Sequence, residues 1–342
     1  MSDAQKKSIG VGNAGILSGM SPDTVKSLMN LVFNFIIPDR HRDIPEGAEP
    51  FSCRSKDFTE LAGWVIHPHR RKACGTIFLF HGFSGNTSHI QWLTDRFSGE
   101  YGFVSVATDL RHHGLSGDAV PTFGEAESWD VMSVIDYAES QGLPKPYVLY
   151  GESLGGMASQ LAVAKDKRVS GVIVNSAPGW AWDAIGKVAD FRSADIKKGM
   201  EKAPGILRSI IPMFAYGMVP VANLINYSYK DDVLSKGDPR NLPSSPGHEP
   251  LFLYMMGDKD HYDINQTRKI FDHWYKDESA EAEVLPGDAP AQKKWFLTME
   301  GATHPDESSN GRHVADWEHF DRAIKEFLEK IAGRKRSSYL LR

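Results

Sequence analysis

Short, continuously apolar segments alternate with amphipathic segments from about residue 51 onward. The apolar segments are rich in β-branched and aromatic residues, which is typical of buried strands. Regular apolar spacing between them predicts helices, most clearly over 127–142 and 314–333. Strands that are apolar on both faces and joined by helices predict an α/β fold with a mostly parallel, doubly wound sheet. The expected strands are Thr59–Pro68, Gly75–Phe80, Gly102–Asp109, Pro146–Gly151, Gly171–Pro178, Pro250–Asp258 and Lys294–Gly301.

One stretch, residues 179–248, interrupts this alternation. It contains no clear strand, carries many aromatic residues and ends in a proline-rich link. We therefore expect an inserted helical cap there, with the α/β core formed by residues 51–178 and 249–333. The alternative is a set of additional helices that covers no site. Residues 334–342 form a basic tail.

The N-terminal segment, residues 1–50, is expected to be partly helical. Its most apolar piece is Leu28–Ile37. This piece favours an amphipathic helix packed on the main domain, although a helix lying on a membrane surface is the alternative, so peripheral membrane contact stays open. No stretch of the chain reaches the roughly 18 uncharged apolar residues of a spanning helix.

The composition argues against several function classes. The chain has 342 residues and a net charge of −5, which offers no broad basic surface for nucleic acid. Two cysteines, Cys53 and Cys74, are too few and too unpatterned for a disulfide framework or a zinc site. They suit a reducing compartment, so we expect a cytoplasmic protein that needs no metal or organic cofactor. The sequence does not indicate an oligomeric state.

A Gly-Glu-Ser-Leu-Gly motif, residues 151–155, lies between an expected strand and an expected helix. Gly-x-Ser-x-Gly at such a junction is the nucleophile elbow, in which a tight turn lifts the serine hydroxyl above the sheet edge. Side chains at Gly151 and Gly155 would collide with the neighbouring strand and helix. The motif alone is a weak signal because glycine and serine are common. Its strand-turn-helix context predicts Ser153 as a nucleophile.

A nucleophilic serine needs a base, and the base needs an acid that orients it. In this architecture the chain order is serine, acid, histidine, and each partner follows a core strand. Asp260 follows the strand at 250–258, and His304 follows the strand at 294–301. We therefore predict a triad of Ser153, Asp260 and His304. The weaker alternatives are Asp258 and Asp263 for the acid, and His261 and His313 for the base.

An oxyanion hole is expected beside the serine. The N–H of Leu154 lies at the start of a helix, where backbone donors are unpaired. The second donor should come from the loop His81–Asn86, and the N–H of Phe83 is the candidate. His81 is expected to brace this loop.

Five segments carry a resemblance to a known family: FLFHGFSGN, ATDLRHHGLSGD, YGESLGGM, MMGDKD and GATHP. Together they resemble an α/β-hydrolase, and more closely the monoacylglycerol lipase, lysophospholipase and serine aminopeptidase branch. The resemblance implies a cap and acyl-ester hydrolysis by Ser153, Asp260 and His304. Glu152 before the serine resembles plant-type monoacylglycerol lipases and phenolic-ester esterases. In one departure, His112 replaces the first glycine of the family's Gly-His-Gly-x-Ser loop.

The sequence therefore predicts a serine hydrolase that cleaves small acyl esters through an acyl-enzyme. In the cap, Trp180, Trp182, Met213 and Phe214 are candidates for an apolar acyl pocket, although a packed cap interior needs the same residue types. A peptidase or amidase of the same branch is one alternative, with a cap carboxylate (Asp183, Asp190 or Asp195) holding a substrate amine. A non-catalytic binding protein that keeps the fold is another.

Overall fold

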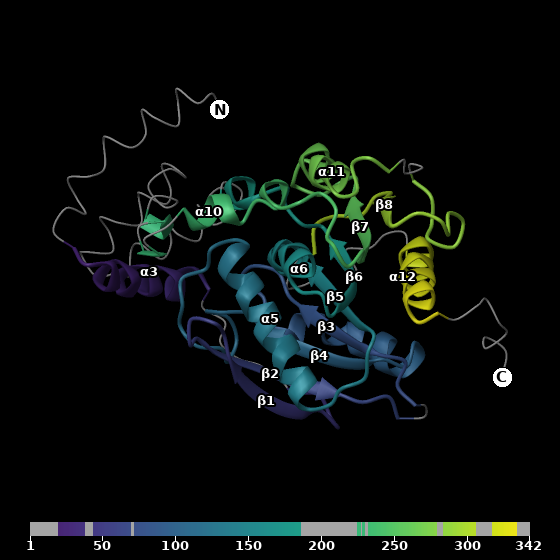
Figure 1. Cartoon of the computed structure of the whole chain (residues 1–342). Coiled ribbons are helices and arrows are strands. Elements are labelled where there is room, and N and C mark those ends of the chain that lie inside the picture. Colours follow the sequence, from purple (N-terminus) through teal and green to yellow (C-terminus); the bar gives the residue numbers. More distant parts are fainter. Residues whose placement is uncertain are drawn as a thin grey trace.

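The computed structural model describes residues 20–37, 44–69, 72–185, 224–226, 228–229, 232–278, 283–305 and 317–333. Within these residues, the strands form an 8-stranded sheet in the order β1-β2-β4-β3-β5-β6-β7-β8 (Figure 1). The strands are β1 (Glu49–Arg54), β2 (Glu60–Ile66), β3 (Thr76–Phe80), β4 (Val104–Asp109), β5 (Tyr147–Glu152), β6 (Val169–Asn175), β7 (Leu251–Gly257) and β8 (Lys294–Met299). Every predicted strand is present, and β1 is an addition that the sequence pattern did not predict.

The sheet is mostly parallel, as predicted. Strands β4, β3, β5, β6, β7 and β8 all pair in parallel, whereas β1 and β2 form an antiparallel hairpin on the edge next to β4. The carboxyl ends of the parallel strands therefore open at one edge of the sheet. In open α/β sheets this edge is where ligands bind.

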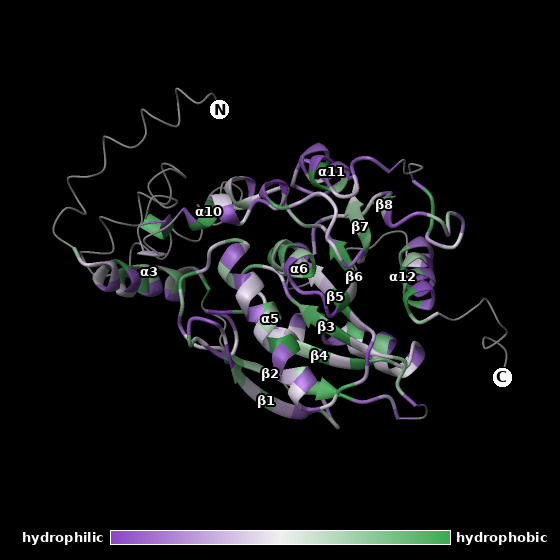
Figure 2. Ribbon diagram, viewed as in Figure 1, coloured by the Kyte–Doolittle hydropathy of each residue, from purple (hydrophilic) through white to green (hydrophobic). Residues whose placement is uncertain are grey.

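Helices cover both faces of the sheet because strand side chains alternate between two apolar cores. On one face, Phe78 and Phe80 pack with α5 (Glu125–Ser140), α6 (Leu154–Lys165) and α11 (Ile264–His273). On the other, Ile77 and Leu79 pack with the helical turns η1 (Thr87–Ile90), α4 (Gln91–Thr94) and η2 (Asp95–Glu100) and with α12 (Trp317–Ile331). Figure 2 shows hydrophobic residues concentrated in central strands such as β3 and polar residues on the outer side of α12.

The N-terminal helix α3 (Pro22–Ile36) packs on the first of these faces. Ser21 caps it by accepting a hydrogen bond from the N–H of Thr24 at 3.1 Å. Its buried side is formed by Val25, Met29 and Phe33, which join the main core. The predicted packing of this segment on the domain is therefore present. Within the described part of the chain, no helix is long and apolar enough to cross a membrane.

The predicted cap is described only at its two ends. Its start contains a short helical turn at 181–185, and its end contains α10 (Val233–Lys236) and η3 (Pro239–Asn241). Met213 and Phe214 lie outside the described residues, as do His313 and the basic tail.

Candidate active site

Ser153 occupies the single-residue turn between β5 and α6. Its φ is 49° and its ψ is −111°, a left-handed conformation that is strained for any residue with a side chain. The turn is fixed from both sides, since the N–H of Ser153 donates to the carbonyl of Asn175 at 2.9 Å and its carbonyl accepts from Met157. The residue is almost fully buried, with 5% of its surface exposed. The predicted strand-turn-helix geometry at Ser153 is therefore present.

The two glycines of the motif are required by close backbone approach. A Cβ at Gly151 would lie 2.2 Å from the carbonyl oxygen of Gly155, and one at Gly155 would lie 2.3 Å from that of Phe80. Both distances are far below contact, and both partners are backbone atoms that cannot move independently. A side chain at either position would therefore collide with the backbone, as predicted from the sequence.

Asp260 and His304 meet at the same sheet edge, after β7 and β8. The Nδ1 of His304 donates to the carboxylate of Asp260, with distances of 3.1 Å to Oδ1 and 3.0 Å to Oδ2. Burial alone would raise the pKa of Asp260, but the hydrogen bond and charge of His304 outweigh it, so the pKa lies below its usual value. An ionised acid thus orients the imidazole, as a base in a triad requires.

Tyr262 packs against this pair. Its N–H donates to the carboxylate of Asp260 at 2.9 Å. Its ring packs edge-on against His304, with centroids 5.1 Å apart. Tyr262, His304 and Asp260 therefore form one group of contacting residues at the sheet edge where Ser153 follows β5.

The structure also describes three of the weaker candidates for the acid and the base: Asp258, Asp263 and His261. Asp258 accepts a hydrogen bond from the N–H of Gly301 at 2.7 Å and stabilises the adjoining turn. Asp263 caps α11 through the N–H of Asn265. His261 lies next to His304, with ring centroids 4.2 Å apart and ring planes tilted by 55°.

A metal could in principle be held here. Asp260, His261 and His304 place ligand atoms within 4.8 Å of one another. However, two of these three side chains, Asp260 and His304, are already hydrogen-bonded to each other through Nδ1. The hydrogen-bonded acid–histidine pair fits acid–base chemistry better than a metal centre.

The predicted oxyanion loop lies directly beside the serine. A Cβ at Gly82 would be 3.3 Å from the Cβ of Ser153, so the backbone before Phe83 passes very close to it. Leu154 is the first residue of α6, as predicted. The ring of Phe83 stacks on Phe123 at 5.2 Å.

Two histidines tie this loop to the one after β4. His81 accepts from the N–H of Leu110 at 3.0 Å and donates to the carbonyl of Gly82 at 2.8 Å. Burial lowers its pKa to about 4, so it remains neutral in this bracing role. His113 accepts from the N–H of Ser84 at 3.1 Å. His81 therefore braces the loop after β3, as predicted.

The loop after β4 keeps its tight turns despite the lost glycine. His112 has a φ of 66°, so a histidine occupies the left-handed region that favours glycine. At Gly114, with a φ of +49°, a Cβ would lie 2.2 Å from the carboxylate of Asp109. That carboxylate accepts from the N–H groups of Thr87 and Leu115 at 2.8 and 2.9 Å. Glycine at 114 thus leaves room for a carboxylate that joins the two loops.

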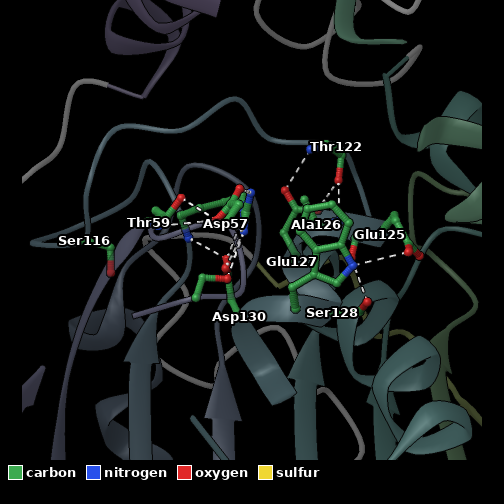
Figure 3. A network of polar contacts seen from close by, with 12 residues as sticks. Asp57, Thr59, Ser116, Thr122, Glu125, Ala126, Glu127, Ser128 and Asp130 are labelled. Carbon is green, nitrogen blue, oxygen red and sulfur yellow. Dashed lines mark hydrogen bonds and ion pairs between the residues drawn. The ribbon is translucent and has the colours of Figure 1, made fainter. Parts of the chain in front are cut away.

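A buried ionic network supports the same loop (Figure 3). The guanidinium of Arg111 is fully buried and donates to Asp130 at 2.6 and 3.0 Å and to Asp57 at 2.8 Å. Nearby, Glu127 accepts from the N–H and hydroxyl of Thr122, both at 2.8 Å. The sequence pattern does not predict this network, because its members come from three segments that are distant in the chain: the β1–β2 turn, the β4 loop and α5.

A second buried polar group lies below the serine. Tyr150 donates to Glu152 at 2.9 Å and accepts from the side-chain amide of Asn175 at 3.0 Å. Burial raises the pKa of Glu152 to about 7, although hydrogen bonds from Tyr150 and Asn175 oppose the rise. In the sequence, Glu152 stands out only by its resemblance to the residue before the serine in related esterases, and its buried hydrogen bond with Tyr150 was not predicted. The alternation of side chains along β5 places Tyr150 and Glu152 on the same face, and this was the signal available.

Of the cap candidates, the structure describes two. Trp180 and Trp182 are partly buried, with ring centroids 6.4 Å apart, and Arg240 lies over the ring of Trp180. Asp183 follows them, and one of its carboxylate oxygens is buried without a hydrogen-bond partner among the described residues. Asp183 is also close enough to raise the pKa of Tyr262 by its charge, after the larger effect of burial.

Comparisons with known proteins agree with this architecture. Residues 71–230, slightly less than half of the chain, match the family described as serine aminopeptidase, S33. A carboxylesterase from Bacillus subtilis is 30% identical over 103 residues, which is 30% of this chain. The match spans only 41% of that carboxylesterase.

Solved structures show the fold at larger coverage. An esterase from Pyrococcus furiosus has a TM-score of 0.56 and 16% identity, covering 86% of this chain and 96% of its own. The α/β-hydrolase GrgF from Penicillium sp. sh18 has a TM-score of 0.55 and 15% identity, with 85% and 100% covered. Est1E from Butyrivibrio proteoclasticus with ferulic acid bound has a TM-score of 0.53 and 16% identity, with 82% and 99% covered.

Proposed function

The chain belongs to the α/β-hydrolase superfamily, and from this premise we propose that it hydrolyses carboxylic esters through an acyl-enzyme on Ser153. One observation carries the proposal. A strained serine follows β5 at the sheet edge where Asp260 and His304, which follow β7 and β8, are hydrogen-bonded to each other. Strain of this kind persists where the surrounding structure fixes it, and it clusters at active sites.

The proposed reaction has two halves. In the first, Ser153 Oγ attacks the ester carbonyl carbon while His304 accepts the serine proton, and the N–H groups of Phe83 and Leu154 hold the developing oxyanion. The bond to the alcohol then breaks, and His304 returns the proton to the departing oxygen. In the second half, His304 deprotonates water, which attacks the acyl carbon and releases the acid and Ser153.

The proposed substrate class rests on the comparisons and on two tryptophans of the predicted cap. A carboxylesterase matches part of the sequence, esterase structures share the fold, and Trp180 and Trp182 supply aromatic surface at the start of the cap. We propose a small acyl ester with an apolar acyl group, of the kind that monoacylglycerol lipases, lysophospholipases or phenolic-ester esterases cleave.

Substitution of the serine tests the proposal. We expect Ser153→Ala to reduce kcat/KM for p-nitrophenyl acyl esters at least about 1,000-fold without loss of folding. A fluorophosphonate probe should label the wild-type protein and not the variant. A correctly folded wild-type protein that remains unlabelled would reject serine catalysis and favour a binding protein.

Aminopeptidase activity is a second candidate, supported by Asp183. A buried carboxylate oxygen without a hydrogen-bond partner among the described residues is suited to accept from a substrate amine. Aminoacyl-nitroanilides should then be cleaved faster than esters, and Asp183→Asn should raise KM for the anilides only. Faster ester turnover would support the carboxylesterase assignment.

A further inference from the structure

Glu152 and Asn175 form the last residue pair of the ladder between β5 and β6. Both residues are buried, and neither takes part in the proposed reaction. The carbonyl of Asn175 accepts from the N–H of Ser153 at 2.9 Å. The pair therefore lies where the sheet ends and the backbone turns into the strained serine.

Side-chain hydrogen bonds join this pair through Tyr150. The hydroxyl of Tyr150 donates to the carboxyl of Glu152 at 2.9 Å and accepts from the side-chain amide of Asn175 at 3.0 Å. Tyr150 is fully buried and lies two residues before Glu152, so both side chains are on the same face of β5. Together with the hydrogen bond between Ser153 and the Asn175 carbonyl, these contacts form a closed ring that includes the backbone of Ser153.

Asn175 is itself held by contacts on the other side of β6. Its side-chain oxygen accepts from the hydroxyl of Ser176 at 3.4 Å. The N–H of Ser176 donates to the carbonyl of Met255 in β7 at 2.8 Å. The end of β6 is thus fixed from both β5 and β7, so the Asn175 carbonyl is a well-placed acceptor for the N–H of Ser153.

The conformation of Ser153 needs such a constraint. A φ of 49° is unfavourable for a residue with a side chain and persists where surrounding contacts fix it. On the helix side of the turn, the Ser153 carbonyl accepts from Met157 of α6. On the strand side, the ring through Asn175 supplies the constraint. Loss of the ring would allow Ser153 to relax, which would change the direction of its hydroxyl.

We propose that Glu152, Tyr150 and Asn175 are positioning residues, whose hydrogen-bonded ring holds Ser153 in its strained, attacking conformation; this rests on the proposed function of Ser153. In this role Glu152 supplies an acceptor oxygen, which a neutral carboxyl group also has. Burial raises the pKa of Glu152 to about 7, so a neutral group at this position is well tolerated. The three residues act through the backbone and side chain of Ser153 and transfer no proton.

Tyr150→Phe opens the ring with the loss of a single oxygen atom. We expect kcat/KM for p-nitrophenyl esters to fall roughly 10- to 100-fold, as when a catalytic group is misplaced by about 1 Å. Tyr147→Phe is the matched control, since it removes a buried hydroxyl that donates to the carbonyl of Leu143 at the opposite end of β5. Both variants lose one hydrogen bond and should be destabilised to a similar extent, but only Tyr150→Phe should lose activity.

Two substitutions of Glu152 test the acceptor. Glutamine keeps an oxygen for the Tyr150 hydroxyl and alanine does not, so kcat/KM of Glu152→Gln should exceed that of Glu152→Ala by at least about tenfold. Combining Glu152→Ala with Tyr150→Phe should cause no further loss, because both changes break the same ring. Equal activities of the glutamine and alanine variants, or additive losses in the double variant, would contradict the ring.

Fluorophosphonate labelling separates this inference from the proposed function. The labelling rate should fall in Tyr150→Phe together with kcat/KM, because both report attack by Ser153. Losses in Tyr150→Phe no larger than those in Tyr147→Phe would overturn the positioning role. Failure of the correctly folded wild-type protein to label would instead overturn the serine mechanism itself.

Discussion

At the scale of single residues, the site depends on groups held in unfavourable states. Ser153 adopts a strained backbone conformation, and Glu152 carries a carboxyl group in a buried position where its proton is retained. Each state costs free energy, roughly 1–3 kcal/mol for a strained backbone. Two hydrogen bonds offset part of this cost: the carbonyl of Asn175 accepts from the N–H of Ser153, and the hydroxyl of Tyr150 donates to Glu152.

The choice between two aspartates can be tested directly. Asp260→Asn should lower kcat/KM for ester substrates by about 1,000- to 10,000-fold, because an amide favours the wrong tautomer of His304. Asp258→Asn changes a turn residue of the same loop, so its activity should stay within about threefold of wild type. Steady-state kinetics of both variants is the measurement. A larger loss in Asp258→Asn would show that the acid has been misassigned.

Glu152 predicts a pH dependence of stability with a definite sign. The folded protein retains the Glu152 proton up to about pH 7, whereas the unfolded chain releases it near 4.5. The folded state therefore binds more protons between these values, so the free energy of unfolding falls as pH rises through this window, by about 3 kcal/mol from this group.

Urea unfolding at pH 5 and pH 8 measures this effect. In Glu152→Gln the side chain cannot ionise, so stability should decline less between the two pH values than in wild type. Parallel declines in the two proteins would contradict a proton held by Glu152.

At the scale of elements, α3 is the least expected contributor to the site. Phe33 packs against Phe83, with ring centroids 6.3 Å apart, and against His112 at 5.8 Å. Lys26 of the same helix lies over the ring of Tyr229, at the end of the predicted cap. The helix thus contacts the loop of a proposed oxyanion donor, the β4 loop and a cap residue.

Phe33→Ala should weaken both stability and catalysis. We expect the free energy of unfolding to fall by about 3 kcal/mol, because a buried aromatic ring is lost. The kcat/KM for esters should fall several-fold as the loop containing Phe83 loses its support. Leu31→Ala is the control on the same helix, since Leu31 is 45% exposed and its loss should cost at most about 0.5 kcal/mol. If Phe33→Ala lowers the free energy of unfolding but leaves kcat/KM unchanged, α3 contributes to stability and not to catalysis.

At the scale of the whole molecule, the Arg111 network joins segments that are distant in sequence. Asp57 comes from the β1–β2 turn and Asp130 from α5, and both meet Arg111 after β4. Asp130→Ala should lower the free energy of unfolding by about 3–5 kcal/mol, because it removes the fully buried partner of a buried cation.

Chemical denaturation provides this measurement, and Arg54→Ala provides its control. Arg54 pairs with Glu60 on the surface, where both side chains are mostly exposed, so its loss should change stability by less than about 1 kcal/mol. Similar effects of the two substitutions would show that burial does not set the strength of the Arg111 network.

The sequence predicted the sheet well, because strands buried on both faces are continuously apolar and stand out from the amphipathic helices between them. It missed β1, in which only Phe51 is fully buried and Glu49, Ser52 and Arg54 are exposed charged or polar residues. It predicted Ser153, Asp260 and His304 as candidates from motif order, and the structure brings Asp260 and His304 into contact. Tyr262 and the partners of Arg111 could not be predicted, because those contacts form only when separate loops converge.

The position of the triad candidates along the chain also affects synthesis. His304 follows Ser153 by about 150 residues, so at the usual pace of translation the strained serine is made roughly ten to thirty seconds before the histidine exists. A growing or prematurely terminated polypeptide would therefore carry the proposed nucleophile without its proposed base. Hydrolytic competence would be acquired only once β8 has joined the edge of the sheet.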